Sequence, residues 1–371
     1  MGTKHSDSNL DIFIELDKPF YYTGEYVQGK VHIHAKAALS YTNLYLHYEN
    51  KEYCRWSETY GRSTVTYVGK KQNFADEFIL HQFPGGIPQG QYTFPFGFQL
   101  PAGLPGSFKE GCCKNFKIYY PVTAFMIDYQ NPNSKPEFKV CATVIEPPRF
   151  PNQTNVRLKN IGNPKTCCCC DQGTSAIDVL YDTTTVKSGQ PVRLTINVDN
   201  RQCKQNVKNV EVTLVQNKFV QSDYGVKRHY SVDKYLQKAA GVAAGYEGLV
   251  HAELDTSSVQ DSTALGTIVA NWYTVRAQAV VAGCICCPCC ACCGNNYPTV
   301  EKDVYIDASS QLAHGPPQFS APLDWSPAPT ERIVYRPQTP PVFQPNLGLP
   351  LINPHYQGLQ TESFELRQYQ Y

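Results

Sequence analysis

A chain of 371 residues, 42% of them hydrophobic, is long enough for two domains that each bury a core. The formal net charge of +1 gives no electrostatic reason to expect a nucleic-acid partner. The N-terminus is polar and no apolar stretch follows it, so we expect no signal peptide and predict a cytosolic protein, where disulfides are rare. The 16 cysteines therefore need another explanation.

The chain begins with a short motif and then a series of strands. Gly2 and Ser6 fit the N-myristoylation pattern, and an ordinary disordered tail is the alternative. Alternating apolar residues predict strands at 10–17, 27–33, 44–48, 118–128 and 138–145. Residues 50–73 are polar and aromatic, which favours a long hairpin or a mobile loop. In the segment 90–108 the aromatic residues at 92, 94, 96 and 98 share one face, Pro95 indicates an edge strand, and the proline-rich end should stop the pairing.

A glycine turn that opens a half-buried strand occurs twice. Gly24 and Gly189 are each followed by a polar residue, and then by apolar residues at every second position. In the second copy the apolar positions are 192, 194, 196 and 198, and polar residues lie between them. Two copies about half a chain apart predict two similar β domains in tandem.

The composition predicts an all-β fold with four parts. We expect an N-terminal sandwich at 8–150, a proline- and asparagine-rich linker with a cysteine run at 151–175, and a second sandwich at 176–308. Strands of the second sandwich are expected after Gly189 and at 210–215, 219–224, 248–254, 266–282 and 300–306. Residues 309–371 are rich in Pro, Gln and Tyr and indicate a disordered tail with short linear motifs.

No enzyme motif or cofactor motif is visible in the sequence. It contains no P-loop, no dinucleotide fingerprint, no G-x-S-x-G and no H-E-x-x-H, so we expect neither catalysis nor a cofactor. His32 and His34 share one face of a predicted strand, where a pair of imidazoles could bind a metal ion. A solvated strand face explains the two histidines better, and we predict no metal site.

Four segments together resemble the arrestin family, most closely the arrestin-domain-containing proteins, or α-arrestins. They are GEYVQGKVHI, GQPVRLTINVDN, QYTFPFGFQLPAGLPGSF and IYYPVTAFMID, and the resemblance covers about residues 10–308 in family order. It implies two tandem antiparallel β-sandwiches of arrestin type. It also implies an adaptor that binds cytoplasmic tails of membrane proteins, often phosphorylated, and that recruits ubiquitin ligases so that the cargo is internalised or sorted.

The sequence departs from the family pattern in two places. α-Arrestin tails typically carry PPxY motifs for WW domains, whereas here each Pro-Pro pair leads to a Phe: Pro316, Pro317 and Phe319, and Pro340, Pro341 and Phe343. Because Phe lacks the hydroxyl, recruitment of a ubiquitin ligase through a WW domain is in question, while the polyproline geometry also fits SH3-type grooves. Residues 18–20 stand where receptor-binding arrestins have an acidic residue of their charged core, which argues against a phosphate-released switch.

Basic residues of the first domain are candidates for binding an acidic or phosphorylated tail. They flank the first strands or the long 50–73 segment, and they are Lys18, Lys30, Lys36, Lys70 and Lys71. The alternative is that each is an ordinary solvated surface lysine.

The cysteines are clustered. Apart from Cys54, Cys141 and Cys203, they form the pair 112–113 and two larger groups, which are Cys167, Cys168, Cys169 and Cys170, and Cys284, Cys286, Cys287, Cys289, Cys290, Cys292 and Cys293. Reversible S-acylation, thiolate metal binding and structural burial are the three explanations, and we favour S-acylation for the two groups. A transmembrane span at 279–294 is not expected, because this segment is too short and contains Pro288.

These observations predict a membrane-associated adaptor of arrestin type at the cytoplasmic face of the plasma or endosomal membrane. Its expected partners are cytoplasmic tails of membrane proteins, the membrane surface through acylated cysteines, and WW-type or SH3-type domains or a ubiquitin ligase. Two alternatives stay open. One is a coat subunit like the arrestin-fold subunit of retromer, and the other is a thiol-rich metal-binding protein.

Overall fold

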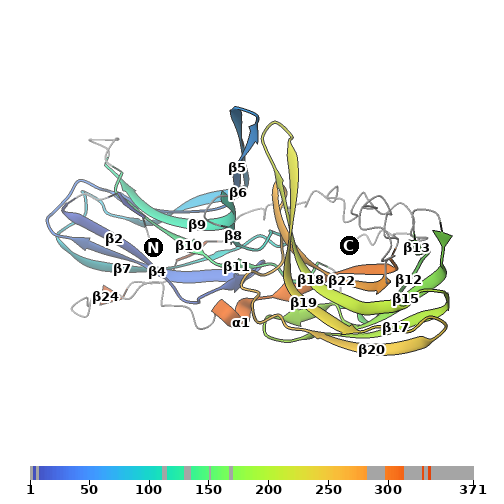
Figure 1. The fold of residues 1–371 in the computed structure, drawn as a ribbon. Helices are drawn as coiled ribbons and strands as arrows, with labels where there is room; N and C mark the ends of the chain where they lie inside the picture. Colours follow the sequence, from blue (N-terminus) through green and yellow to red (C-terminus); the bar gives the residue numbers. More distant parts are fainter. Residues whose placement is uncertain are drawn as a thin grey trace, which may run out of the picture.

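The computed structural model describes residues 3–5, 8–110, 115–128, 135–149, 152–166, 170–281, 297–312, 328–329 and 333–335. Every described element except the four-residue helix α1 (Ser309–Leu312) is a β-strand. The strands form two halves that lie end to end, and both contribute to a projection near the middle of the molecule (Figure 1). The predicted all-β fold is confirmed.

The first half contains two sheets and a short parallel pair. Sheet N1 has the order β1 (Thr3–His5), β10 (Glu137–Ala142), β9 (Asn115–Ile127), β5 (Asn43–Tyr60) and β6 (Ser63–Gln82), with β8 (Phe108–Glu110) beside β9. Sheet N2 has the order β2 (Leu10–Leu16), β4 (Tyr26–Ala35) and β7 (Gly90–Gln99), with β24 (Ala328–Pro329) and β25 (Ile333–Tyr335) parallel to β7. The parallel pair joins β3 (Tyr21–Tyr22) to β11 (Val144–Ile145).

The second half repeats this plan. Sheet C1 has the order β16 (Thr185–Lys187), β23 (Thr299–Asp307), β22 (Val269–Val281), β18 (Val207–Gln221) and β19 (Lys227–Ala240), with β21 (Ala264–Leu265) beside β22. Sheet C2 has the order β12 (Thr154–Gly162), β15 (Gly173–Thr183), β17 (Val192–Cys203) and β20 (Glu247–Leu254). A further pair joins β13 (Lys165–Thr166) to β14 (Cys170–Asp171). The parallel pairing of β16 with β23 corresponds to that of β3 with β11.

The repeated turn predicted from the sequence is present in both halves. Gly24 has φ 84° and Gly189 has φ 88°, a left-handed conformation that favours glycine. The strands that follow point their apolar side chains inward, and Val27, Val31, Ile33, Val192, Ile196 and Val198 are all fully buried. The turn and the alternation are therefore equivalent in the two halves, as expected.

The two halves have cores of different composition. The core of the first half is rich in aromatic side chains, among them Tyr48 and Phe98, which stack. The core of the second half consists mainly of Val, Ile and Ala side chains. Val220, Ala264 and Val269 from the second half belong to the first core, so the two halves are packed against each other.

Three features differ from the sequence-based expectation. The expected linker at 151–175 contains β12, which pairs with β15 over eight positions, so the connection between the sheets is shorter. The strand β19 was not predicted, because its residues KRHYSVDKYLQKAA lack a buried face. In the expected tail the structure describes α1, β24 and β25, and the rest of that tail lies outside the described residues.

Candidate functional site

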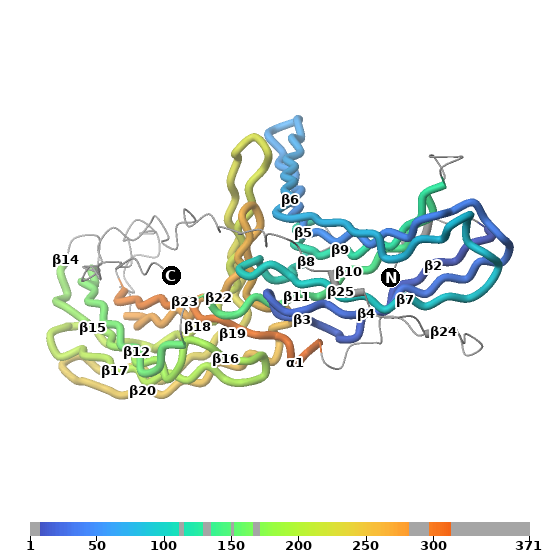
Figure 2. Tube along the Cα trace, turned by 180° about the vertical axis from the view of Figure 1, so that it is seen from behind, coloured from blue at the N-terminus to red at the C-terminus, as the bar shows by residue number. Residues whose placement is uncertain are grey.

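Two hairpins stand side by side and form the projection near the middle of the molecule, here called the crest (Figure 1, Figure 2). The crest consists of residues 54–69 of the β5–β6 hairpin and residues 219–230 of the β18–β19 hairpin. Gly61 and Gly225 lie at the two turns with φ 62° and 79°. Because the hairpins come from different halves, their contact also joins the two halves.

Backbone hydrogen bonds hold the hairpins together. The amide of Asp223 donates to the carbonyl of Val68 at 2.9 Å, and the amide of Lys70 donates to a carboxylate oxygen of Asp223 at 2.9 Å. The buried thiol of Cys54 donates to the carbonyl of Gln221 at 3.2 Å. Burial raises the pKa of this thiol to about 11, which makes Cys54 a structural cysteine without thiolate chemistry at neutral pH.

Gly69 allows the hairpins to approach this closely. A Cβ atom at this position would lie 2.3 Å from the carbonyl oxygen of Gln221 and 2.7 Å from the sulfur of Cys54. Neither atom is the far end of a flexible side chain, so a larger residue would force the hairpins apart.

An ion pair nearer the tip adds a second link between the hairpins. Arg228 binds Glu58 with two nitrogens, and one of the two contacts is 2.7 Å long. Hydrogen bonding to Arg228 lowers the pKa of Glu58 to about 2, so Glu58 stays ionised at neutral pH. Tyr60 also donates to Glu58, and this bond raises the pKa of the Tyr60 hydroxyl to about 12. The aromatic hydroxyl is therefore neutral at the crest tip.

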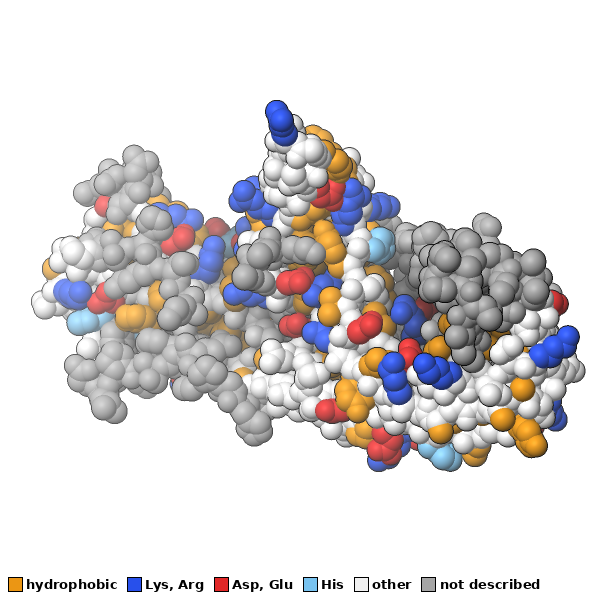
Figure 3. All heavy atoms as spheres, in the orientation of Figure 1, with side chains coloured by type: hydrophobic (Ala, Val, Ile, Leu, Met, Phe, Trp, Pro, Cys, Tyr) orange, Lys and Arg blue, Asp and Glu red, His pale blue; other side chains and the backbone are white. Residues whose placement is uncertain are grey.

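The crest presents aromatic and basic side chains to solvent. Tyr224 is 91% exposed and Tyr60 is 54% exposed, which is unusual for large aromatic residues. The exposed cations of the two hairpins and their bases are Arg55, Arg62, Lys70, Lys71 and Lys227. Figure 3 shows Lys and Arg side chains gathered at the tip and around the base of the projection, with hydrophobic side chains between them. Exposed aromatic rings beside cations are typical of surfaces that bind other macromolecules.

Below the crest, a buried carboxylate of the first half binds backbone amides of the second. Glu52 on β5 is 1% exposed and accepts hydrogen bonds from the amides of Thr267, Ile268 and Val269 at 2.7–2.9 Å. The side-chain amide of Asn73 donates to the same carboxylate at 2.7 Å. Three successive amides converging on one anion form a nest, which stabilises its negative charge without a cation.

A second buried carboxylate binds the segment just before this nest. Glu146 accepts from the amide of Leu265 at 2.8 Å and from the amide of Gly106 at 3.1 Å. Arg149 binds both the Glu146 carboxylate and the Leu265 carbonyl. Burial raises the pKa of Glu146, while Arg149 and the two amides oppose that rise. Residues 265–269 are therefore bound by two carboxylates of the first half.

Comparison with known families supports the fold of the first half. Residues 10–149 match the family model of the arrestin (or S-antigen) N-terminal domain. Residues 10–149 therefore carry an arrestin N-terminal domain, which supports membership of the chain in the arrestin family. No curated protein matches the chain. The matched region contains the crest hairpin β5–β6 and both interface carboxylates, and it supports an arrestin-type adaptor in general terms.

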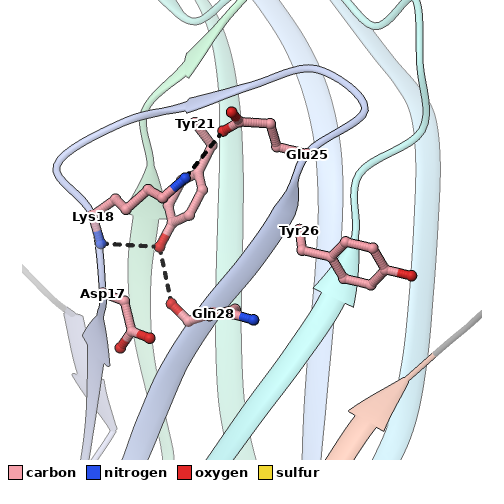
Figure 4. A pocket seen from close by; sticks show the side chains of 6 residues that line it. All are labelled: Asp17, Lys18, Tyr21, Glu25, Tyr26 and Gln28. Carbon is pink, nitrogen blue, oxygen red and sulfur yellow. Dashed lines mark hydrogen bonds and ion pairs between the residues drawn. The ribbon is translucent and has the colours of Figure 1, made fainter.

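The arrestin domain does not bring the five candidate lysines together. Lys18 lies beside an open pocket lined by Asp17, Lys18, Tyr21, Glu25, Tyr26 and Gln28 (Figure 4). Its ammonium group is 3.6 Å from Glu25 and 5.7 Å from the centre of the Tyr21 ring. Lys18 is thus an exposed lysine with a surface ion-pair partner of its own, and it lies outside the crest.

Two more of the candidate lysines lie on β4 or directly after it, in sheet N2. Lys30 is half-buried between Glu15 and Pro95 in the strand register. Lys36 follows the far end of β4, where it pairs with Asp11 at 3.1 Å. Only Lys70 and Lys71, on β6, lie at the base of the crest. The prediction that these five residues form cargo contacts stays untested, and the geometry favours the last two.

The remaining candidates have no described side chains. The acylation candidate Gly2, the cysteines at 167–169 and 284–293, and the tail motifs at 316–319 and 340–343 lie outside the described residues. Cys170 is described only as part of β14. Within the described ranges, no group of three or more His, Cys, Asp or Glu side chains could hold a metal ion. The part of the chain that the structure describes also contains no helix that could span a membrane.

Proposed function

We propose that this protein is a membrane-associated adaptor whose crest binds cytoplasmic tails of membrane proteins and directs their trafficking or endocytosis. The crest carries the proposal, because it places exposed aromatic and basic side chains of both halves on one surface. Cytoplasmic tails that are acidic or phosphorylated offer the opposite charge. An extended tail is also flexible enough to contact both hairpins at once.

The two crest tyrosines provide the direct test. Replacing Tyr60 and Tyr224 with Ala should weaken binding of a captured cargo-tail peptide at least tenfold, because exposed aromatic residues are frequent hot spots of binding. The cargo would first be identified by affinity purification from native membranes, and its tail peptide would then be titrated against the pure protein. Tyr246→Ala is the matched control, since Tyr246 is 68% exposed but lies in the turn before β20.

The outcome separates this proposal from the alternatives. If the double variant binds the tail as tightly as the control, the crest is not the cargo site. Recovery of a stoichiometric coat complex instead of transient cargo would favour the retromer-like alternative. Deletion of residues 310–371 tests the tail motifs. If the deletion abolishes recruitment of a ubiquitin ligase, or of WW-type or SH3-type domains, and leaves cargo binding intact, the tail motifs recruit these partners.

We also propose that the cysteine cluster at 284–293 is S-acylated. The cluster lies between β22, which ends at Val281, and β23, which begins at Thr299, and these strands are antiparallel neighbours. We expect the segment that joins them to be a loop, where thiols would be accessible to acyltransferases. Because one acyl chain binds membranes only marginally, several chains would make attachment stable.

Changing the seven cysteines of the cluster to Ser should move the protein from the membrane fraction to the cytosol. Hydroxylamine treatment of the native protein should release acyl groups from the wild type and not from the variant. Cys203→Ser is the control, since Cys203 is a buried cysteine of β17 and should not be acylated. Stoichiometric zinc on the pure wild type, with no acyl release, would contradict the acylation proposal and support metal binding.

A further inference from the structure

Two lysines on the outer face of sheet N1 lie directly opposite each other. Lys109 on β8 pairs with Lys117 on the antiparallel strand β9. Like charges at directly opposite positions destabilise a sheet. Among the described residues neither lysine has an ion-pair partner, and Lys117 instead lies between Tyr53 and Tyr119, with its ammonium 5.1 and 4.5 Å from the ring centres. The stability of the sheet therefore does not explain why two lysines face each other at this position.

A third lysine extends the positive charge along the same face. Lys139 on β10 pairs with Thr123, six positions along β9 from Lys117. At about 3.4 Å per residue the three lysines span a strip about 20 Å long. Cys141 lies between them, and Lys139, Lys117 and Lys109 all oppose the rise that burial causes in the pKa of its thiol. In the strand register Cys141 lies opposite Pro121, between the positions of Lys117 and Lys139 along β9.

Nearby acidic side chains do not neutralise the strip. Glu110 is bound to Lys218 of the second half at 2.8 Å. Glu49 is 5% exposed and is bound to Lys51 at 2.6 Å. Glu137 on β10 is the acidic residue that shares the outer face at the end beyond Lys139. The strip thus keeps a net positive charge that an anionic partner could neutralise.

The shape of the strip favours an extended anionic surface over a single phosphate group. A length of about 20 Å exceeds the reach of one phosphate, and the lysines lie on the face of the sheet rather than in a cavity. The backbone groups of β9 already pair with β5, β8 and β10, so an added peptide strand has no free ladder on β9. Tyr53 and Tyr119 beside Lys117 match the preference of tyrosine for the membrane interface.

The N-terminal strand leads to the same place. β1 pairs with β10 so that Thr3 lies opposite Lys139. The strand begins one residue after Gly2, and consecutive Cα atoms are about 3.8 Å apart. Gly2 itself lies outside the described residues, and the acyl chain that the sequence predicts there would add a lipid anchor at this end of the chain. One myristoyl chain plus a basic patch is a known combination for stable membrane attachment.

We propose that Lys109, Lys117 and Lys139 form a docking face for anionic membrane lipids. The partner is the negatively charged headgroup surface of a bilayer. This docking face adjoins the base of the crest, since Lys117 lies opposite Tyr53, but it does not depend on the proposed cargo binding.

The experiment measures binding of the full-length protein to vesicles. Non-acylated protein and N-myristoylated protein would each be floated with vesicles of phosphatidylcholine alone or with 30 mol% phosphatidylserine. Each lysine near an anionic surface strengthens binding roughly fivefold, so changing all three to Gln should weaken binding on the order of a hundredfold. The effect should appear only with phosphatidylserine and should shrink at high salt.

A matched variant controls for total charge. Lys159, Lys204 and Lys208 of the second half are exposed, and changing them to Gln alters the net charge equally. The proposal predicts that this control binds anionic vesicles like the wild type. Because Lys109 and Lys117 repel each other, the strip variant should keep the melting temperature of the wild type.

Three outcomes would overturn the proposal. The strip variant could bind anionic vesicles as tightly as the wild type, or the control variant could lose as much binding as the strip variant. Alternatively, the wild type could fail to bind vesicles and bind a phosphorylated acidic peptide through the three lysines, which would make the strip a peptide site. The vesicles contain no cargo, so failure of the crest proposal would not affect this result.

Discussion

Replacing Glu52 with Ala is expected to destabilise the protein by on the order of 3–5 kcal/mol and to separate the unfolding of its two halves. The substitution leaves the amides of Thr267, Ile268 and Val269 without their acceptor at a buried contact. Burying donors without a hydrogen bond is costly, so the contact would open to water. Thermal unfolding followed by calorimetry should show two transitions in place of one shared transition.

Glu253→Ala is the control for this effect. Glu253 also lies on a strand and pairs with Arg193 at 2.9 Å, but its side chain is 63% exposed. Exposed pairs contribute about 0–1 kcal/mol, so the melting temperature should change little. Equal destabilisation by the two substitutions would show that the buried nest has no special role in joining the halves.

Gly69→Ala is expected to separate the two crest hairpins and to abolish cargo-tail binding. Its new Cβ atom would lie 2.3 Å from the carbonyl oxygen of Gln221, which is closer than real Cβ contacts permit. Relief requires the hairpins to move, which breaks the hydrogen bonds between Asp223 and Val68 and between Lys70 and Asp223. Amide hydrogen exchange should become faster at these positions, and tail binding should fall below detection.

Gly61→Asn tests whether the effect depends on packing. Gly61 also lies in the β5–β6 hairpin, but no atom lies within 4 Å of an added Cβ. Its φ of 62° falls in the left-handed region, which Asn tolerates better than most residues. This variant should keep both the exchange pattern and tail binding. Retention of tail binding in Gly69→Ala would mean that the two hairpins need not be joined to bind cargo.

The fold was predictable because its signals are local. A glycine in the left-handed region followed by alternating Val and Ile residues identifies a strand within about ten residues, and Gly24 and Gly189 showed this twice. Because these two glycines lie about half a chain apart, the sequence predicts two similar domains without information on which residues are in contact. β12 and β19 were missed because neither has the buried alternating face on which that argument depends.

The site was harder to predict because its signals are not local. Glu52 lies between the core residues Tyr48 and Cys54, at a position where the strand alternation points side chains inward. The sequence thus indicates a buried carboxylate, but it does not show what binds it. Its partners are backbone amides more than 200 residues away, and backbone groups leave no trace in a sequence. For the same reason Lys109 and Lys117 were not predicted as a pair, because strand register decides that they face each other.

The long chain separation across the interface has a consequence for synthesis on the ribosome. Glu146 and Leu265 are 119 residues apart in the chain, and they hydrogen-bond in the finished protein. At about 5–20 residues per second, roughly 6–24 s pass between the appearance of the two residues. During that interval the first half can form sheet N1 and the β2–β4–β7 part of sheet N2 while Glu52 and Glu146 are still hydrated. The nascent chain therefore passes through a stage with an open, charged surface that nascent-chain chaperones can reach before residues 265–269 arrive.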